Sequence, residues 1–153
     1  LSQFIAEQVP EKHFIFNDGF CHVHKSIHSE DVKKAKELHP DALVLAHPEC
    51  TSDTLALADF IGSTSQIIDY ATASDSKKFL ICTEMGVFYE LMQKNPDKKF
   101  FSVGHRQFCP NMKKVSLDKV LEKLEDLKDE VILPEEMCEQ AKKPLDEMLR
   151  LAQ

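Results

Sequence analysis

The sequence predicts an α/β fold, a three-layer αβα sandwich built on a parallel sheet. Short runs of β-branched, aliphatic or aromatic residues alternate with longer stretches in which apolar residues recur at helical spacing. Each apolar run ends in a polar loop, and no low-complexity segment or Gly/Ser linker interrupts the alternation. Strands that alternate with helices of this length are typical of parallel βαβ units.

The part of the chain before Gly62 predicts two strands and two helices. Ser29 can cap the first helix, whose first turn is acidic, and Pro40 stops it. Thr51 or Ser52 can cap the second helix, and Gly62 ends it. In order, the expected elements are a strand at residues 13–16, a helix at 29–39, a strand at 42–46 and a helix at 53–61.

The part after Gly62 continues the alternation. Pro96 breaks one amphipathic helix, Ser116 can cap another, and Pro134 suits the first turn of the last. In order, the expected elements are a short helix at residues 67–73, a strand at 78–82, a helix at 85–94, a strand at 99–103, a helix with Leu117, Val120, Leu121 and Leu124 on one face, a strand at 131–133 and a helix from Pro134 onward.

Composition excludes several classes of protein. The 153 residues, 42% hydrophobic, can bury the core of one compact domain, and no apolar run approaches the ~20 residues that cross a membrane. The net charge of -7 is spread along the chain without a basic stripe, so we expect no nucleic-acid partner. Five scattered cysteines indicate a reducing cytoplasm rather than a secreted disulfide scaffold. The N-terminal residues lack the pattern of a signal peptide and read as a chain entered midway.

Reactive side chains follow the ends of the expected strands. The carboxyl ends of parallel strands meet at one edge of a sheet, which is where ligands bind. We therefore expect thiols, imidazoles and carboxylates to gather at one edge. The residues concerned are Cys21, His22, His24, His47, Glu49, Thr83, Glu84, His105 and Cys109.

Spacing alone leaves several interpretations of this edge open. Cys21-x-x-His24 and His47-x-x-Cys50 form a mirrored pair whose four ligands suit tetrahedral zinc. Burial of the thiols and hydrogen bonding of the imidazoles to the backbone would explain the same residues without a metal. His47 and Glu49 could also serve as a proton-transfer pair, or their proximity could be incidental.

Two further groups have functional and structural interpretations. The hydroxyls of Ser63 and Thr64 could hold an anion at the start of a helix, or simply cap that helix. Cys82 lies inside an apolar run, and Cys138 lies at helical spacing in the last helix. Packing explains both of these thiols better than chemistry does.

Four segments in order resemble quinolinate synthases. DGFCHVHK resembles the family's Gly-x-Cys-x-Val-His segment, and LAHPECTSDTLALADFIGSTSQII resembles its His-Pro-Glu-Cys and Gly-Ser-Thr stretch. ICTEMGVFYELMQKNPDKKF is similar to the Thr-Glu-x-Gly region, and FCPNMKKVSLDKVLEKLE to the Cys-x-Asn-Met-Lys segment. The resemblance runs along essentially the whole chain with compatible spacing.

The resemblance implies three αβα domains around a pseudo-threefold axis, with the active site at the centre. This chain would then lack the family's N-terminal portion. Residues 1–24 would end the preceding αβα domain, and residues 25–108 would form one αβα domain. Residues 109–153 would form a C-terminal segment with a cluster-ligand loop and helices.

The resemblance also implies a cofactor, a 4Fe-4S cluster held by three cysteines with one iron left open as a Lewis acid. Cys21 and Cys109 match two of the ligand positions, whereas Cys50 does not. The third cysteine has no counterpart in this chain. Because two thiolates hold such a cluster poorly, we expect the chain alone to be inactive.

The implied reaction condenses iminoaspartate with dihydroxyacetone phosphate to quinolinate. Glu49 and His47 would be catalytic, with Glu49 transferring protons once desolvation raises its pKa. His24 would line the substrate pocket with them, and Ser63 and Thr64 would bind a carboxylate or phosphate. Expected partners are the missing N-terminal portion and an aspartate oxidase that supplies iminoaspartate. A zinc protein and a non-catalytic apo domain are the alternatives.

Overall fold

The computed structural model describes residues 1–152 and divides into two compact units. The sheet unit spans Leu1–Pro110, and the C-terminal unit begins at Asn111. The reactive residues that follow the expected strands, from Cys21 to Cys109, all belong to the sheet unit.

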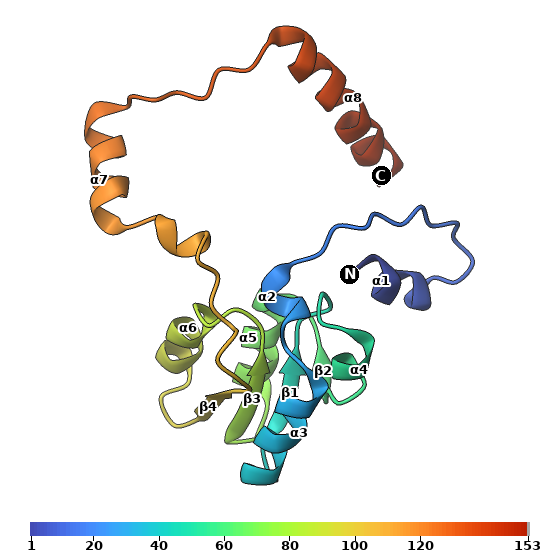
Figure 1. Ribbon diagram of the computed structural model, residues 1–153, viewed down its shortest axis with the longest axis vertical. Coiled ribbons are helices and arrows are strands. Elements are labelled where there is room, and N and C mark those ends of the chain that lie inside the picture. The colour runs from blue at the N-terminus through green and yellow to red at the C-terminus, as the bar shows by residue number, and fades with distance from the viewer. Residues whose placement is uncertain (153) are drawn as a thin grey trace. The chain divides into compact units, whose positions relative to one another are not determined.

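The sheet unit is built on four parallel strands in the order β2-β1-β3-β4 (Figure 1). The bounds are β1 Leu43–Ala46, β2 Phe60–Ile61, β3 Lys78–Cys82 and β4 Lys99–Ser102. In the central pair, Leu43 lies beside Phe79 and Ala46 beside Cys82. This register ends β1 and β3 at the same level and places the loops that follow them together.

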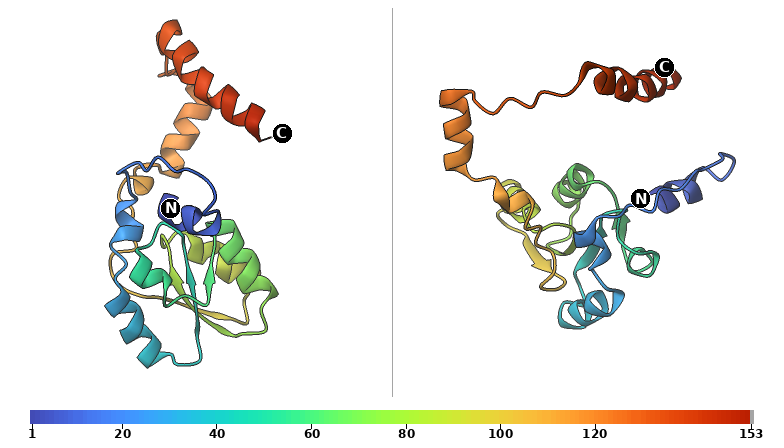
Figure 2. Two further views of the ribbon diagram at one scale, coloured as in Figure 1. Left: turned by 90° about the vertical axis from the view of Figure 1, so that its right-hand side faces the viewer. Right: turned by 45° about the horizontal axis from the view of Figure 1, so that its top comes forward.

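Helices cover both faces of this sheet, as the two views of Figure 2 show. The bounds in the sheet unit are α1 Ser2–Gln8, α2 His22–Lys25, α3 Ser29–Leu38, α4 Ser52–Leu55, α5 Thr64–Ala73 and α6 Val87–Lys94. The predicted αβα sandwich with a parallel sheet is confirmed.

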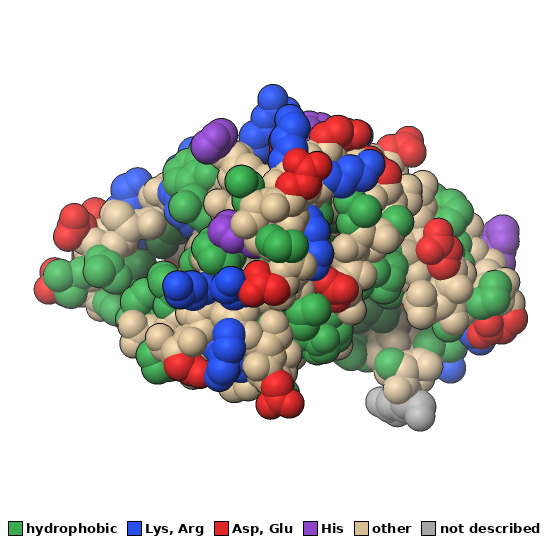
Figure 3. All heavy atoms as spheres, turned by 90° about the horizontal axis from the view of Figure 1, so that it is seen from below, with side chains coloured by type: hydrophobic (Ala, Val, Ile, Leu, Met, Phe, Trp, Pro, Cys, Tyr) green, Lys and Arg blue, Asp and Glu red, His purple; other side chains and the backbone are tan. Residues whose placement is uncertain are grey.

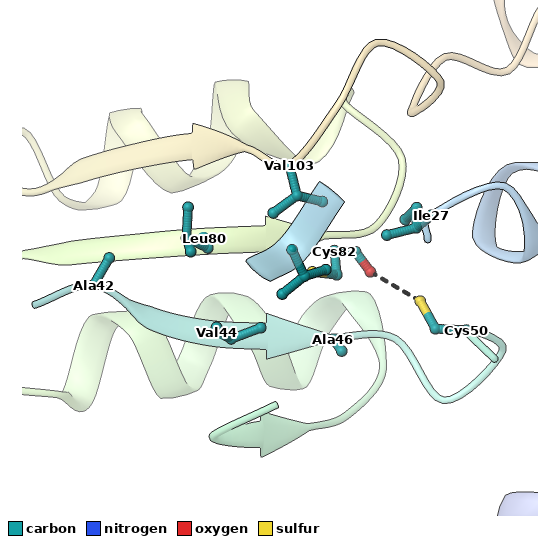
Figure 4. Close-up of a cluster of buried hydrophobic side chains, with 9 residues drawn as sticks. Ile27, Ala42, Val44, Ala46, Cys50, Leu80, Cys82 and Val103 are labelled. Atoms are coloured by element: carbon teal, nitrogen blue, oxygen red, sulfur yellow. Dashed lines mark hydrogen bonds between the residues drawn. The ribbon is translucent and has the colours of Figure 1, made fainter. Parts of the chain in front are cut away.

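The core consists of two buried clusters, one on each face of the sheet. Val44 and Leu80 pack with Val32 of α3 on one face, and this cluster includes Cys50 and Cys82 (Figure 4). The other cluster joins the sheet to α5 and α6, and its buried members are Leu45, Ile67, Ile68, Ala71, Phe79, Ile81, Val87 and Leu91. Strands buried on both faces explain the unbroken apolar runs seen in the sequence.

Two predicted strands are wrong. Residues 13–16 and 131–133 form neither helix nor strand, and Ile15 and Val131 have exposed fractions of 91% and 83%. A single extended segment leaves its backbone N–H and C=O groups without ladder partners. Neither segment pairs with a strand among the described residues. An apolar run alone is therefore not enough to form a strand there.

The predicted helix at residues 53–61 is also wrong in its second half. Only the turn of α4 is helical, and Phe60–Ile61 form the edge strand β2. Asp59 binds Val44 of β1 through both its backbone and its side chain. Its backbone N–H donates to the Val44 carbonyl at 2.8 Å, and its carboxylate accepts from the Val44 N–H at 2.7 Å. Pairing with β1 therefore overrides the local helical spacing.

Helix starts differ in how their caps work. Ser29 does not cap α3 with its side chain, because its hydroxyl donates to the Asp53 carboxylate at 2.8 Å. Ser63 caps α5 in a capping box, accepting from the Gln66 N–H while the Gln66 side chain accepts from the Ser63 N–H. The predicted short helix at 67–73 is thereby extended to begin at Thr64.

The C-terminal unit contains a short 3-10 turn and two helices. The bounds are η1 Met112–Lys114, α7 Leu117–Asp126 and α8 Glu135–Leu151. Ser116 is at the N-cap position of α7, as predicted, although its side chain makes no cap hydrogen bond. Pro134, predicted in the first turn of the last helix, lies one residue before it, at the N-cap position of α8. No side chain between residues 111 and 152 is buried.

The surface agrees with the charge pattern of the sequence. Acidic and basic side chains are mixed across the face shown in Figure 3. Among the described residues, no helix is both long enough and apolar enough to cross a membrane.

Candidate functional site

The centre of the site is a hydrogen-bonded group of four side chains at the carboxyl edge of the sheet. His24 comes from α2, His47 and Glu49 come from the loop after β1, and Thr83 directly follows β3. His24 Nδ1 lies 3.0 Å from Glu49 Oε2, and His24 Nε2 lies 2.9 Å from Thr83 Oγ1. Both ring nitrogens of His24 therefore have protein partners.

His47 completes this group by stacking. Its ring lies 4.2 Å from that of His24, centroid to centroid, at an interplanar angle of 8°. The Glu49 backbone N–H donates to His47 Nδ1 at 3.3 Å, and this nitrogen lies 3.7 Å from Glu49 Oε2. Glu49 is thus held beside two imidazoles, and its side chain keeps 31% of its surface exposed.

Both imidazoles are shifted towards the neutral form. Burial lowers the pKa of His24, although its hydrogen bond and charge interaction with Glu49 act in the opposite direction. Burial also lowers the pKa of His47, and the neighbouring His24 lowers it further. A stacked pair of neutral rings beside a carboxylate can orient that carboxylate and exchange protons with it.

Cys21 brings a thiol close to this group. It occupies the N-cap position of α2, and its sulfur lies within 4.8 Å of ligand atoms of His24 and Glu49. Cys21 and Cys109 are both half-buried free thiols. The predicted clustering of Cys21, His24, His47 and Glu49 at one edge is therefore what the structure shows.

Cys109 is held by its backbone. Its N–H donates to Glu84 Oε1 at 3.2 Å, and the other carboxylate oxygen of Glu84 accepts from the Gly86 N–H at 2.6 Å. Gln107 ties the same loop to the end of β3, because its buried side-chain amide donates to the carbonyls of Ile81 and Thr83 at 2.6 Å. The sheet thus fixes the segment that presents this thiol.

Two other thiols of the sheet unit, those of Cys50 and Cys82, are buried. The Cys50 thiol donates to the Cys82 carbonyl at 3.4 Å, and burial raises the pKa of Cys50 to about 12 (Figure 4). Burial also raises the pKa of Cys82 well above its usual range. The ligand atoms that lie within 4.8 Å of one another include those of Cys21 and His24 but not those of His47 and Cys50, so the predicted four-ligand zinc site is not assembled in the structure. The close group is Cys21, His24 and Glu49.

Ser63 and Thr64 lie at the same edge, after β2. The Gly62 N–H donates to the Ala46 carbonyl, which carries the β1–β2 pairing up to this turn. The capping box uses the Ser63 hydroxyl as an acceptor, so this serine caps the helix, which is one of the two predicted roles. Its O–H proton and the exposed Thr64 remain available to an anion.

Two features of this site carry little signal in the sequence. The sequence predicts only that Thr83 follows a strand, whereas its bond to His24 joins residues 59 positions apart. Gln107 gave no signal beyond its place in a polar loop. His22 and His105, by contrast, were expected at the edge and are exposed.

This fold and site define an α/β protein that gathers a carboxylate, two neutral imidazoles and two free thiols at the carboxyl edge of a parallel sheet. The family model described as NadA, quinolinate synthetase A protein, matches residues 1–150. The chain belongs to the quinolinate synthase family, as the resemblance indicated.

Several relatives named quinolinate synthase support this membership. The chain is 51% identical over 151 residues to the protein of Caldicellulosiruptor bescii, 42% identical over 153 residues to that of Clostridioides difficile and 41% identical over 157 residues to that of Aquifex aeolicus. At least 99% of this chain is covered in each case, against 49–50% of the relative. The chain spans about half the length of the curated relatives it matches.

Proposed function

We propose that this chain supplies part of the active site of a quinolinate synthase, an enzyme of NAD biosynthesis that condenses iminoaspartate with dihydroxyacetone phosphate. Quinolinate, phosphate and water are the products. The observation that carries the proposal is the partly exposed Glu49 carboxylate, held by His24 beside the Cys21 thiol. Ring formation from these substrates requires protons to be removed from carbon and returned to oxygen, which a positioned carboxylate can do.

Cys21 and Cys109 would hold a 4Fe-4S cluster together with a third cysteine from outside this chain. Both are free, half-buried thiols on segments anchored at the same sheet edge, whereas Cys50 and Cys82 are buried with raised pKa values. The donor set therefore fits such a cluster. When bound, the cluster would supply a Lewis-acidic iron for carboxylate, hydroxyl or carbonyl oxygens of the substrate.

The side chains of this chain divide the remaining work. Glu49 takes a proton from a substrate carbon and returns it to a leaving oxygen, while His24 holds the carboxylate in place through Nδ1–H. His47, stacked on His24, lines the same pocket. Thr64 and the Ser63 O–H bind a substrate carboxylate or phosphate at the start of α5.

We extend the proposal to the whole enzyme. Three αβα domains would surround a pseudo-threefold axis, with residues 1–24 ending one domain, 25–108 forming another and 109–153 forming the C-terminal segment. A further polypeptide segment would complete the pocket, and an aspartate oxidase would supply iminoaspartate. The cysteine pattern favours a reducing cytoplasm as the location.

The experiment that tests this proposal measures iron, sulfide and the visible spectrum after anaerobic reconstitution. The chain is reconstituted alone and then together with the N-terminal half of a quinolinate synthase. We expect a stable cluster and quinolinate formation only in the combined sample. A Glu49→Gln variant should retain the cluster and lose about 10²- to 10⁴-fold in kcat, whereas the exposed Glu37→Gln variant should match the unmodified chain.

The same samples decide between this function and a second candidate. The close group of Cys21, His24 and Glu49 could hold a single zinc ion with an open position. Zinc in place of iron in both samples would support that candidate and contradict the synthase. A folded chain that takes up neither metal in either sample would indicate a non-catalytic domain.

A further inference from the structure

Thr83 makes one side-chain contact that none of the functions above uses. The residue is 1% exposed, and its hydroxyl lies 2.9 Å from His24 Nε2. The backbone around it is fixed, because the Thr83 carbonyl accepts from Gln107 and the residue directly follows β3. A hydroxyl at this place therefore has a defined position relative to the sheet.

The hydrogen-bond chemistry determines the form of the His24 ring. A carboxylate can only accept, so the contact between Glu49 and Nδ1 requires a proton on Nδ1. In the neutral ring Nε2 then carries a lone pair, and the Thr83 hydroxyl is the donor that satisfies it. If the hydroxyl were absent, this nitrogen would be buried without a donor.

We propose that Thr83 is a positioning residue that fixes the Nδ1–H form of His24 and thereby holds the Glu49 carboxylate in its orientation. Thr83 does not touch the substrate. It acts through His24, as outer partners of functional imidazoles do elsewhere. The effect of Thr83 on catalysis rests on the proposed function. Its effect on which nitrogen of the His24 ring carries the proton does not.

The test that is independent of catalysis is histidine 15N NMR on this chain. We expect His24 to show a protonated Nδ1, an unprotonated Nε2 and a slowly exchanging Nδ1–H. Thr83→Val removes the hydroxyl and should broaden or abolish the Nδ1–H signal and give a mixture of ring forms. Thr83→Ser retains the hydroxyl and should restore the original spectrum.

Thr54→Val is the matched control. Thr54 is also fully buried, and its hydroxyl donates to the Ile27 carbonyl at 2.9 Å rather than to an imidazole. Its replacement removes a comparable hydrogen bond and should leave the His24 signals unchanged. Equal effects of Thr54→Val and Thr83→Val on His24 would overturn the proposal, because they would reveal a general loss of packing.

Two other outcomes would also overturn it. One is a proton on Nε2 of His24 in the unmodified chain, a result that needs no variant to fold. The other is a Thr83→Val spectrum identical to that of the unmodified chain. Neither result bears on whether the family reaction takes place.

The catalytic consequence is measured in the enzyme completed with its N-terminal half. Thr83→Val should lower kcat about tenfold, the value of one buried hydrogen bond in the transition state. KM should stay within about twofold, and Thr83→Ser should restore the rate. A normal kcat in a Thr83→Val enzyme whose His24 signals have changed would contradict the claim that this ring orients Glu49.

Discussion

At the scale of single residues, the five cysteines fall into different environments although the sequence presents them alike. Cys50 and Cys82 belong to the buried cluster between α3 and the sheet. Cys21 and Cys109 are half-buried at the carboxyl edge, and Cys138 is exposed on α8. Because the thiolate is the reactive form, environment should separate them chemically.

Alkylation rates should show this separation. Treating the folded chain with iodoacetamide near neutral pH should label Cys138, Cys21 and Cys109, while Cys50 and Cys82 stay unmodified until the chain unfolds. The reason is that burial raises the pKa of both buried thiols and shields them. Mass spectrometry of peptides gives the rates. Labelling of Cys50 as fast as that of Cys138 would show that the Cys50 thiol is not buried.

Stability should fall as the solution becomes acidic. Burial lowers the pKa of both His24 and His47 in the folded chain, so the unfolded chain binds more protons below about pH 6.5. The stabilising contribution is therefore present above that pH and is lost as pH falls through the lower folded pKa values. Urea unfolding at a series of pH values measures this. A His47→Gln variant should show a weaker pH dependence, and an equal dependence would contradict the assignment.

At the scale of elements, the turn between β2 and α5 is closely packed around Gly62. A Cβ atom on Gly62 would lie 2.7 Å from the Phe60 ring and 2.9 Å from the Gln66 Cβ. By contrast, a Cβ on Gly104 would meet only the Asp31 side chain, at 3.6 Å. Gly62 is therefore required for close approach, and Gly104 is not.

Replacing these two glycines tests that difference. Gly62→Ala should destabilise the sheet unit by about 1–3 kcal/mol, because Phe60 or the start of α5 must shift. Gly104→Ala should change the free energy of unfolding by less than about 0.5 kcal/mol. Urea unfolding monitored by circular dichroism compares them. Equal stability of the two variants would show that the turn adapts at little cost.

The elements also show what sequence patterns can and cannot predict. Strands β1 and β3 were predicted because an apolar run buried on both faces is a local signal, and β4 was predicted from the apolar run around Phe100 and Phe101, which are half-buried. Strand β2 was not, because two residues next to a helical pattern become a strand only through pairing with β1. The run at residues 13–16 has the same local signal and no partner among the described residues.

The site was predictable to a similar extent. That His24, His47 and Glu49 would lie together follows from the rule that ligands bind beyond the carboxyl ends of parallel strands. The contact between His24 and Thr83 depends on side-chain orientation across 59 positions of sequence. The spacing of residues along the sequence carries no information on side-chain orientation. For the same reason, the spacing suggested Cys50 as a zinc ligand.

At the scale of the whole molecule, burial is confined to one unit. All the core residues belong to Leu1–Pro110, while α7 and α8 contribute no buried side chain. The apolar side chains of α7, such as Leu117 and Leu124, are 87% and 70% exposed. The stability of the sheet unit should thus be independent of the C-terminal unit.

Truncation after Pro110 measures this independence. The shortened chain should unfold cooperatively with a Tm within about 4 °C of that of the full chain, because a loss of 1 kcal/mol would shift a unit of this size by about 4–8 °C. The control is truncation within the core, after Asn95, which removes β4 and should abolish cooperative unfolding. A large drop in Tm on truncation after Pro110 would show that α7 and α8 contribute to the core.

The strand order has a consequence for synthesis. β1 pairs with β3 along its whole length, yet α4, β2 and α5 leave the ribosome between them. Until Cys82 has emerged, nascent β1 can pair only with the two residues of β2. Leu45 then lacks its neighbour Ile81 on β3. Late closure of a parallel pair leaves apolar strand edges open. Translation up to this point is therefore the interval in which a chaperone would have most to protect.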